Sequence, residues 1–484
     1  MRVKRLSEVS HSFLPVFSLD VQNPGNRLAT GGNDNRVKIW DVGVLVSEEK
    51  EKKESGGSLS IGNSSLDQSE SSPALLAVLC NHSAPVNVVR WSPDGRYLAS
   101  GGDDRCVLVF YYSTSSLGNR AFGESEGNSI ESWCLGAMLR GHESNVTDLC
   151  WSPNGAFLVS CSLDNSVFVW DVTKRSRVAK LEGHLGFVKG VSWDPINKFI
   201  ATASDDHTVM LWRTDDWSLE QRISGPFEKS GDNMFFRRLS WSPDGQLLAV
   251  PAAHQGKFHV ATLLSRNSQF EASHSLVGHR QAVVVSRFAP GMYGIPQSKE
   301  GKKIDKMQEG KNGVLEDLDK AFSLCALGSL DCGVSIWASV SPRPLTVIKN
   351  LFQQAVHDVC WMADGLGVLA CSGDGEVVAI SFLSSEIGQP LPNTICPQRT
   401  PSASHSLLIP QNPHHLVAGE NSRDGSRLSL PSASNAGQSS VSDTVAELES
   451  AKRAQKVSLG KDGRKRIAPQ FLGAGGMQHS QAPP

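Results

Sequence analysis

The sequence lacks the features that would point to a membrane, secreted or polyanion-binding protein. It holds no run of about 18 apolar residues, so it predicts no transmembrane helix and no membrane partner. The first ten residues are charged and lack the apolar segment of a secretory signal, so we expect no leader peptide. The formal net charge is only −2, which predicts no general affinity for nucleic-acid phosphates, so any contact with DNA is expected to be indirect.

Paired cysteines are also missing. The ten cysteines stand singly, at positions 80, 106, 134, 150, 161, 325, 332, 360, 371 and 396, and no C-x-x-C pair occurs. This spacing gives no support to a zinc site, and we expect neither a metal nor a cofactor. Several cysteines lie inside apolar runs, as Cys150 and Cys161 do, which is typical of reduced, buried thiols in a cytosolic or nuclear protein.

A repeated tract is the strongest positive signal in the 484 residues. Trp91-Ser92-Pro93-Asp94-Gly95 recurs as Trp151-Ser152-Pro153-Asn154-Gly155 and as Trp241-Ser242-Pro243-Asp244-Gly245. Variants of it begin at Trp193 and Trp361. Each copy lies between two apolar, alternating runs, and Pro with Gly is the composition of a tight turn. The tract therefore predicts a series of β-hairpins.

A second periodicity combines a His, a Ser or Thr, an Asp and an aromatic residue at nearly fixed offsets. The four sets are His11, Thr30, Asp34, Trp40; His82, Ser100, Asp104, Phe110; His142, Ser160, Asp164, Trp170; and His184, Thr202, Asp206, Trp212. These offsets resemble the structural tetrad of WD repeats, in which hydrogen bonds link the Asp to the His, the His to the hydroxyl, and the hydroxyl to the indole N–H. Such a chain gives every buried polar group a partner, and each unsatisfied group would cost about 1–3 kcal/mol.

The same residue types also occur in the catalytic triad of hydrolases. Here, however, the set repeats once per unit, and no G-x-S-x-G elbow accompanies it. We therefore interpret the sets as structural and predict a binding scaffold with no catalytic residues.

The repeats predict an all-β fold, a seven-bladed WD-repeat β-propeller, followed by a disordered C-terminal tail. Four blades carry the tetrads, and a fifth, from about Arg237 to Leu264, has lost its tetrad. A sixth runs from Gly278-His279 to Asp331 and Trp337, with Leu327 in place of the hydroxyl, and a seventh spans Val356 to Phe382, with Asp374 in its turn and Ile380 in place of Trp. Because an open ring leaves unpaired strand edges, we expect Val3 to Val9 to pair with the last blade.

The composition divides the chain into four regions. Residues 1–385 form the predicted propeller, with loops at 46–73, 113–132 and 291–319. Residues 386–450, rich in Ser, Pro, Asn and Gln, form a predicted disordered linker. Residues 451–473 form a basic motif, and residues 474–484 a disordered end.

The basic motif has three open interpretations. Between residues 452 and 466 the sequence holds seven Lys or Arg against one Asp, and Asp462-Gly463 is a two-residue turn signal. A short basic β-hairpin that adds to the sheet edge of another protein fits this pattern. A nuclear-import signal and a solvated basic patch fit it equally well.

Two stretches carry a resemblance to a known family. The blade segments Gly183 to Pro195, Leu211 to Trp217 and Asp364 to Ser372 look like those of the HIRA family of histone chaperones. The tail segment Asp462-Gly463-Arg464-Lys465-Arg466-Ile467-Ala468-Pro469 resembles the B domain of that family, except that Ala468 and Gln470 stand where Thr and Leu are usual. Family members continue into a second conserved domain, so we expect this chain, which ends at Pro484, to be a truncated or short form.

The resemblance implies a nuclear scaffold for replication-independent nucleosome assembly and transcriptional regulation, including repression. The implied partners are the anti-silencing-function histone chaperone, core histones reached indirectly, and ubinuclein-like and other complex subunits. Arg464, Lys465 and Arg466 would then pair with acidic groups of the chaperone, Ile467 would fill an apolar pocket, and Pro469 would direct the exit of the strand. Two other classes stay open: the propeller subunit of chromatin assembly factor one, suggested by Phe235 to Ser240, and a WD-repeat ubiquitin-ligase adaptor.

Overall fold

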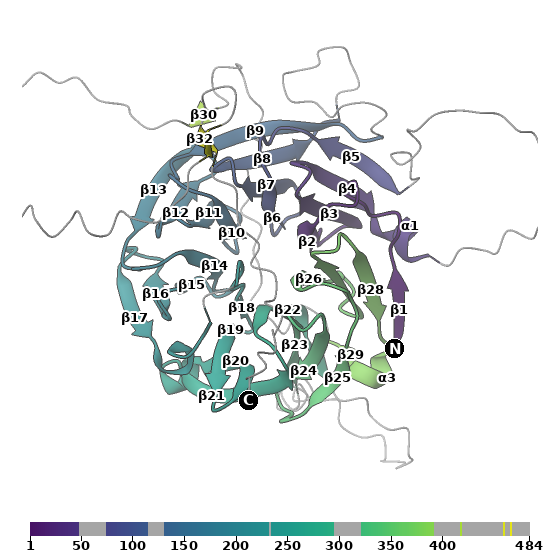
Figure 1. Ribbon diagram of the computed structural model, residues 1–484, viewed down its shortest axis with the longest axis vertical. Coiled ribbons are helices and arrows are strands. Elements are labelled where there is room, and N and C mark those ends of the chain that lie inside the picture. Colours follow the sequence, from purple (N-terminus) through teal and green to yellow (C-terminus); the bar gives the residue numbers. More distant parts are fainter. Residues whose placement is uncertain are drawn as a thin grey trace, which may run out of the picture. The chain divides into compact units, whose positions relative to one another are not determined.

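The computed structural model describes residues 1–47, 74–114, 130–231, 234–294 and 321–391, together with the backbone of three short strand segments nearer the C-terminus. The chain divides into two units, 1–421 and 422–484, and the described residues of the first form seven blades arranged in a ring (Figure 1). The predicted seven-bladed propeller is therefore confirmed. The predicted loops and linker fall largely outside the described residues. In the described part, no helix is long and apolar enough to cross a membrane.

Each blade has four antiparallel strands, to which a short fifth strand, β29 or β30, is added in two of the sheets. The four strands follow one another from the channel outwards, as inner, second, third and outer strands. The inner strands are β2 (Val16–Val21), β6 (Val86–Trp91), β10 (Val146–Trp151), β14 (Val188–Trp193), β18 (Ser240–Trp241), β22 (Val283–Gly294) and β26 (Val356–Trp361). The second strands are β3 (Arg27–Gly32), β7 (Tyr97–Gly102), β11 (Phe157–Ser162), β15 (Phe199–Ser204), β19 (Leu247–Gln255), β23 (Phe322–Ser329) and β27 (Gly367–Ser372).

The outer half of each blade completes the sheet. The third strands are β4 (Val37–Asp41), β8 (Cys106–Tyr112), β12 (Val167–Asp171), β16 (Val209–Arg213), β20 (Phe258–Ser265), β24 (Val334–Ala338) and β28 (Val377–Ser381). The outer strands are β5 (Leu75–Leu79), β9 (Trp133–Arg140), β13 (Ser176–Leu181), β17 (Leu219–Ile223), β21 (Glu271–His279), β25 (Pro344–Ile348) and, in blade seven, β1 (Arg2–Arg5).

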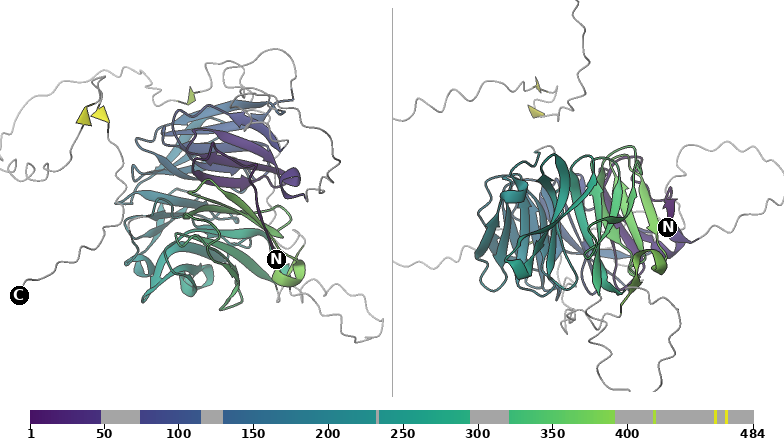
Figure 2. Two further views of the ribbon diagram at one scale, coloured as in Figure 1. Left: turned by 45° about the vertical axis from the view of Figure 1, so that its right-hand side comes forward. Right: turned by 90° about the horizontal axis from the view of Figure 1, so that it is seen from below.

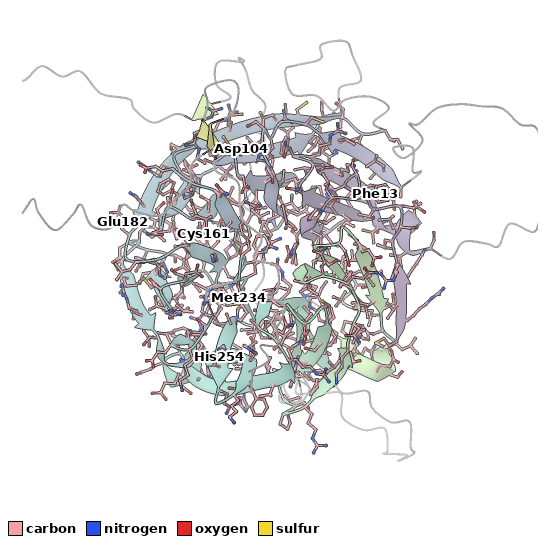
Figure 3. All side chains as sticks on the ribbon, in the orientation of Figure 1. Phe13, Asp104, Cys161, Glu182, Met234 and His254 are labelled. Carbon is pink, nitrogen blue, oxygen red and sulfur yellow. The ribbon has the colours of Figure 1, made fainter. Side chains whose placement is uncertain are left out.

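The inner strands are buried on both faces because neighbouring blades pack against each other face to face. In β6 and β14 every residue is buried, whereas β13 and β17 in the outer positions are mostly exposed. Both of these inner strands begin with Val and end with Trp, residue types that suit a strand buried on both sides. Side chains fill the space between the blades around the ring (Figure 3).

The Trp-Ser-Pro tracts form the turns between first and second strands. In the tract of blade two, Gly95 has φ +69°, its N–H bonds the Ser92 carbonyl at 2.9 Å, and Ser92 Oγ accepts the Tyr97 N–H at 2.9 Å. Gly is favoured there because side chains rarely adopt a positive φ. We call the end of the ring that carries these turns the Trp-Ser-Pro face. The opposite end, which carries the turns at Asp34, Asp104 and their equivalents, is the Asp-turn face; Figure 2 shows the blades from two further sides.

The N-terminal strand closes the ring. β1 pairs with β28 from Arg2↔Ser381 to Arg5↔Val378, and the Leu6 N–H adds one more bond to the Val377 carbonyl. The pairing predicted for Val3 to Val9 is thus found, over Arg2 to Leu6. Lys4 donates to the carbonyls of Leu45 and Ser47 at the end of α1 (Val42–Val46), which ties the closing strand to blade one.

Further short elements complete the described chain. Two 3₁₀ turns lie in blade five, η1 (Gly225–Phe227) before its inner strand and η2 (Arg266–Ser268) before its outer strand. After blade seven come α3 (Ser384–Ile387) and β29 (Gln389–Pro390), and β29 pairs with the end of β22 in blade six. β30 (Val417–Ala418) pairs in parallel with β9.

Candidate functional site

The structure brings the four members of each predicted tetrad together. In blades one to four the His Nδ1 lies 2.6–2.9 Å from the Asp carboxylate, and the His Nε2 lies 2.6–2.8 Å from the hydroxyl. In blades one, three and four the indole N–H donates to the same hydroxyl at 2.8–3.0 Å. Because a carboxylate only accepts, Nδ1 donates to Asp and Nε2 accepts from the hydroxyl.

Blade two shows a shortened version of this chain. Phe110 has no N–H, so Ser100 bonds only to His82 within the set, and the apolar ring is fully buried in its place. In all four blades the His and the hydroxyl are buried, and the Asp also binds backbone N–H groups, as Asp164 does with those of Glu143 and Ser166 at 2.9 Å. Hydroxyls held in this way, between a histidine and an indole or beneath a buried ring, serve packing and are not placed to attack a substrate.

The Asp carboxylates titrate at low pH as a result. Hydrogen bonds from His142 and from Ser166 hold the pKa of Asp164 well below its usual range, against the effect of burial. The pKa of Asp331 in blade six falls to about 2 because His279 donates to it, again against burial. Both groups therefore stay ionised and stabilise their turns at neutral pH.

The sequence predicts that blade six lacks the hydroxyl of the tetrad, because Leu327 stands in its place. The structure shows that this prediction is wrong. Ser335 on β24 takes that role: its Oγ lies 2.8 Å from His279 Nε2 and accepts the Trp337 indole N–H at 2.9 Å. Ser335 is the direct cross-strand partner of Leu327. The hydroxyl has thus moved to the neighbouring strand at the same rung, and the polar chain is complete. The sequence signal was a Ser two residues before the Trp.

Replacing Ser335 by Ala should lower the free energy of unfolding by about 1–3 kcal/mol, because it leaves the His279 ring and the Trp337 indole N–H without their partner. Urea unfolding monitored by tryptophan fluorescence measures the change. Ser176→Ala on the exposed face of β13 is the control and should change stability little. An equal, small effect of both substitutions would contradict the role assigned to Ser335.

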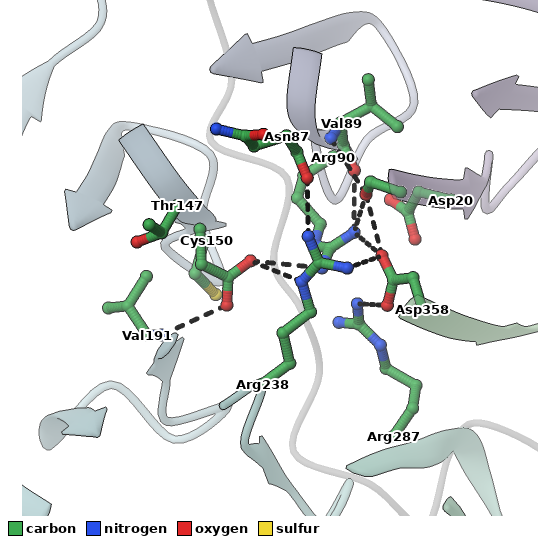
Figure 4. Close-up of polar contacts among 12 residues, drawn as sticks. Asp20, Asn87, Val89, Arg90, Thr147, Cys150, Val191, Arg238, Arg287 and Asp358 are labelled. Atoms are coloured by element: carbon green, nitrogen blue, oxygen red, sulfur yellow. Dashed lines mark hydrogen bonds and ion pairs between the residues drawn. The ribbon is translucent and has the colours of Figure 1, made fainter. Parts of the chain in front are cut away.

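A second cluster, which sequence reasoning missed, lies in the central channel. Arg238 comes from the segment before β18 and is only 1 % exposed. Its guanidinium donates to the carbonyls of Phe17, His357 and Asn87 at 2.6–2.9 Å, which lie in blades one, seven and two. It forms ion pairs with two carboxylates: Asp358, 3.0 Å away, which Figure 4 shows beside it, and Asp148, 3.6 Å away. One arginine thereby connects blades on several sides of the channel.

Aromatic side chains cover this arginine towards the Asp-turn face. The Arg238 guanidinium carbon lies 3.9 Å from the centre of the Phe236 ring, within the range of a cation–π contact. Phe17 and His357 pack around Phe236, with ring centres 6.3 and 5.9 Å from it. Met234, just before Phe235, is buried and lies towards the inner side of the ring (Figure 3). The segment from Met234 to Arg238 therefore fills this end of the channel.

Burial in this cluster lowers the pKa of His357 to about 4, with the nearby Arg238 charge acting in the same direction. The folded state thus disfavours the protonated ring, so stability is lost as the pH falls from about 6.5 towards 4. Between about pH 7 and pH 5 the loss due to this ring should be about 2 kcal/mol.

Urea unfolding of the wild type and of His357→Gln at these two pH values measures that contribution, because the variant should show a smaller decrease in stability. The same decrease in both proteins would contradict the assignment.

A ring of tryptophans lies at the Trp-Ser-Pro face. In four of the five tracts the first residue uses its indole N–H to bond a backbone carbonyl of the preceding blade: Trp91 to Asp20, Trp151 to Arg90, Trp241 to Ser192 and Trp361 to Arg287, at 2.9–3.4 Å. In the variant tract of blade four, Trp193 donates instead to the Asn197 side-chain oxygen at 2.8 Å. The sequence predicted only the turn that follows each Trp. The contact joins neighbouring blades, so it has no signal within a single repeat.

The basic motif in the tail is described only at two strand segments. β31 (Ser458–Leu459) and β32 (Lys465–Arg466) pair antiparallel, with Ser458↔Arg466 and Leu459↔Lys465. The backbone therefore forms the predicted hairpin. The register of these two strands differs by one residue from the register that a two-residue turn at Asp462-Gly463 would give, because such a turn would pair residues 461 and 464. The prediction of a two-residue turn is therefore wrong. Arg464, Ile467 and Pro469 lie outside the described residues.

Fold, tetrads and ring closure together define a WD-repeat β-propeller, a class of protein that presents surfaces to partners. The family model described as the CAF1B/HIR1 beta-propeller domain matches residues 1–387. The chain belongs to this family, and the curated relatives that it resembles include HIRA proteins. "Protein HIRA" of Gallus gallus and that of Homo sapiens are each 41% identical to it over 396 residues, which is 81% of this chain and 36% of theirs. "Protein hir1" of Schizosaccharomyces pombe is 31% identical over 394 residues, 80% of this chain and 38% of its own. The chain thus spans a little over a third of the length of these relatives.

Proposed function

We propose that this chain is a subunit of a nuclear, replication-independent histone chaperone complex that assembles nucleosomes and regulates transcription. In this proposal the propeller is the scaffold, and residues 451–473 bind the anti-silencing-function histone chaperone. Core histones are reached through that chaperone, and ubinuclein-like proteins complete the complex. The observation that carries the proposal is membership of the CAF1B/HIR1 family over residues 1–387, joined to a basic segment whose backbone pairs as a hairpin.

The hairpin suits docking on the sheet edge of a partner. A paired strand presents backbone N–H and C=O groups on its free side, and these add to another sheet, while alternate side chains give specificity. Arg464, Lys465 and Arg466 supply positive charge for acidic groups on the chaperone, Ile467 supplies an apolar anchor, and Pro469 ends the strand because it has no N–H to donate.

The test is binding of the full chain to the purified chaperone. Replacing Arg464, Lys465 and Arg466 by Glu should lower the affinity at least about 100-fold, because three attractive charges become repulsive. Replacing Lys452, Arg453 and Lys456 by Glu makes the same change in net charge within the motif, but away from the three basic residues proposed to pair with the chaperone, and should weaken binding far less. Equal losses in the two variants would reduce the contact to general electrostatics and contradict the proposal.

The second candidate function is the propeller subunit of chromatin assembly factor one, which is replication-coupled. The observation that favours it is the family description itself, which joins the two kinds of propeller under one model. Affinity capture of the full chain from nuclear extract separates them. Recovery of ubinuclein-like proteins supports the first proposal, and recovery of subunits linked to the replication clamp supports the second.

A further inference from the structure

The channel contains a chamber of about 230 Å³ at the Trp-Ser-Pro face. One level of its wall is formed by equivalent residues, one from each inner strand, each directly preceding the Trp position of its blade. These residues are Asp20, Arg90, Cys150, Ser192, Ser240, Arg287 and Cys360. Four of them are Cys or Ser, whose small side chains leave the space open. The other three are charged, so the chamber is a polar pocket rather than a gap in apolar packing.

Towards the other face of the ring, Arg238 occupies the channel. Arg238 stands one level nearer to the Asp-turn face, where its backbone bridges to Val285, and its side chain spans the channel to blades one, two and seven. Figure 4 shows Arg238 close to Arg90 and Asp358, with Arg287 and Asp20 nearby, and Arg238 also forms an ion pair with Asp148. The chamber therefore opens through the ring of tryptophans.

The two arginines in the chamber wall differ in how many of their hydrogen-bond donors are already used within the protein. Arg90 is buried, and its terminal nitrogens already bond the carboxylates of Asp358 and Asp148, the Ser18 hydroxyl and the Val89 carbonyl. Arg287 makes one long hydrogen bond to the Val359 carbonyl, 3.3 Å, and one ion pair of 3.6 Å to Asp358. Its Nη2 is buried and has no hydrogen-bond partner among the described residues, while 24% of the side chain as a whole is exposed. Arg287 is thus the cation with capacity for a ligand.

Asp20 lies at the same level of the chamber wall, and its carboxylate accepts one hydrogen bond from the described residues. Its carboxylate accepts the Trp91 N–H at 2.8 Å, and no described Lys or Arg nitrogen forms an ion pair with it. Burial raises the pKa of Asp20, with the Asp358 charge acting in the same direction, although Arg90 and Arg287 oppose the rise. When Asp20 is protonated, Arg90, Arg238 and Arg287 face two carboxylates only, and one positive charge is in excess. This balance favours an anion over a cation.

We infer that the chamber binds the side-chain carboxylate of an acidic peptide segment of a partner protein. The segment enters through the Trp and Pro rings of the Trp-Ser-Pro face, its carboxylate pairs with Arg287, and a neutral Asp20 donates a hydrogen bond to it. Aromatic rings around the mouth supply apolar contact for the peptide on either side of the acidic residue. This second docking site lies in the propeller, apart from the tail hairpin of the proposed function, so the failure of either leaves the other standing.

The experiment titrates the full chain with short acetylated and amidated peptides. Ac-Gly-Glu-Glu-Gly-NH2 is the probe, the same peptide with Gln or with Lys in place of Glu is the comparison, and inorganic phosphate is the third arm. Binding is followed by calorimetry and by the fluorescence of the tryptophans at the mouth. The Glu peptide should bind at least about tenfold more tightly than the Gln and Lys peptides and phosphate. Its affinity should rise as the pH is lowered below about 7, because burial raises the pKa of Asp20 and so favours the neutral acid that donates to the peptide.

Two variants locate the contact. Arg287→Gln should reduce the affinity for the Glu peptide at least about tenfold, whereas Arg213→Gln, an exposed arginine on the rim of blade four, should leave it unchanged. Asp20→Asn retains an acceptor for the Trp91 N–H and mimics the neutral acid, so it should bind the peptide more tightly at neutral pH and lose the pH dependence. Tighter binding of the Lys peptide, equal binding of phosphate, or an unchanged affinity in a folded Arg287→Gln protein would each overturn the inference.

Discussion

Replacing Arg238 by Met should lower the free energy of unfolding by about 3–5 kcal/mol, although a single side chain is changed and its length is nearly kept. The substitution removes the donor to three buried carbonyls, those of Phe17, His357 and Asn87. It also removes one of the cations that holds Asp358, a carboxylate with no exposed surface. Buried polar groups left without partners are costly, and they lie here in several blades at once.

Urea unfolding, followed by tryptophan fluorescence, measures this loss, and the exposed Arg213→Met is the matched control, which should leave stability essentially unchanged. Arg238→Lys keeps the charge but lacks the planar fork of donors, so it should be intermediate. If Arg238→Met unfolds like the wild type, the arginine does not connect the blades.

Replacing Asp164 by Ala should lower the free energy of unfolding by about 2–4 kcal/mol without affecting the binding of the chaperone through the tail. The carboxylate bonds the His142 ring and two backbone N–H groups, and the variant leaves these donors unsatisfied. Asp374→Ala in blade seven is the comparison. Asp374 holds the N–H groups of Gln353 and Glu376 in the same type of turn, but Phe352 stands where blade three has its histidine, so the loss should be smaller.

The alternative interpretation of the tetrads, as hydrolytic Ser, His and Asp sets, makes the opposite prediction. It requires that Asp164→Ala abolish an activity while the melting temperature stays unchanged. Thermal unfolding and a hydrolysis assay on the same samples distinguish the two.

The fold was largely predictable because most of it repeats. The spacing of a single tetrad, such as His184, Thr202, Asp206 and Trp212, is enough to predict most of one blade. Four such sets, together with the Trp-Ser-Pro turns, predict the propeller. Blade six shows the limit of that method. The polar chain needs a hydroxyl at one point in space, and Ser335 reaches this point from the strand next to Leu327. A search for the hydroxyl only at the position equivalent to Leu327 therefore missed Ser335.

The channel was not predictable for a related reason. Arg238 bonds residues 221 and 151 positions away in the sequence, namely Phe17 and Asn87, and such contacts exist only once the ring has closed. The indole of Trp151 likewise bonds the preceding blade. The tail motif was found from its charge and its turn signal, but the register of its two strands was not.

The most direct measurement on the proposed function is the affinity of the full chain for the anti-silencing-function chaperone when Ile467 is changed. Calorimetry should find wild-type binding at micromolar affinity or better, a small loss for Ile467→Val, and no measurable binding for Ile467→Glu, which would place a charge in an apolar pocket. Circular dichroism and the melting temperature should stay those of the wild type, because the change lies outside the propeller. Undiminished binding by Ile467→Glu would contradict the claim that the tail carries this contact.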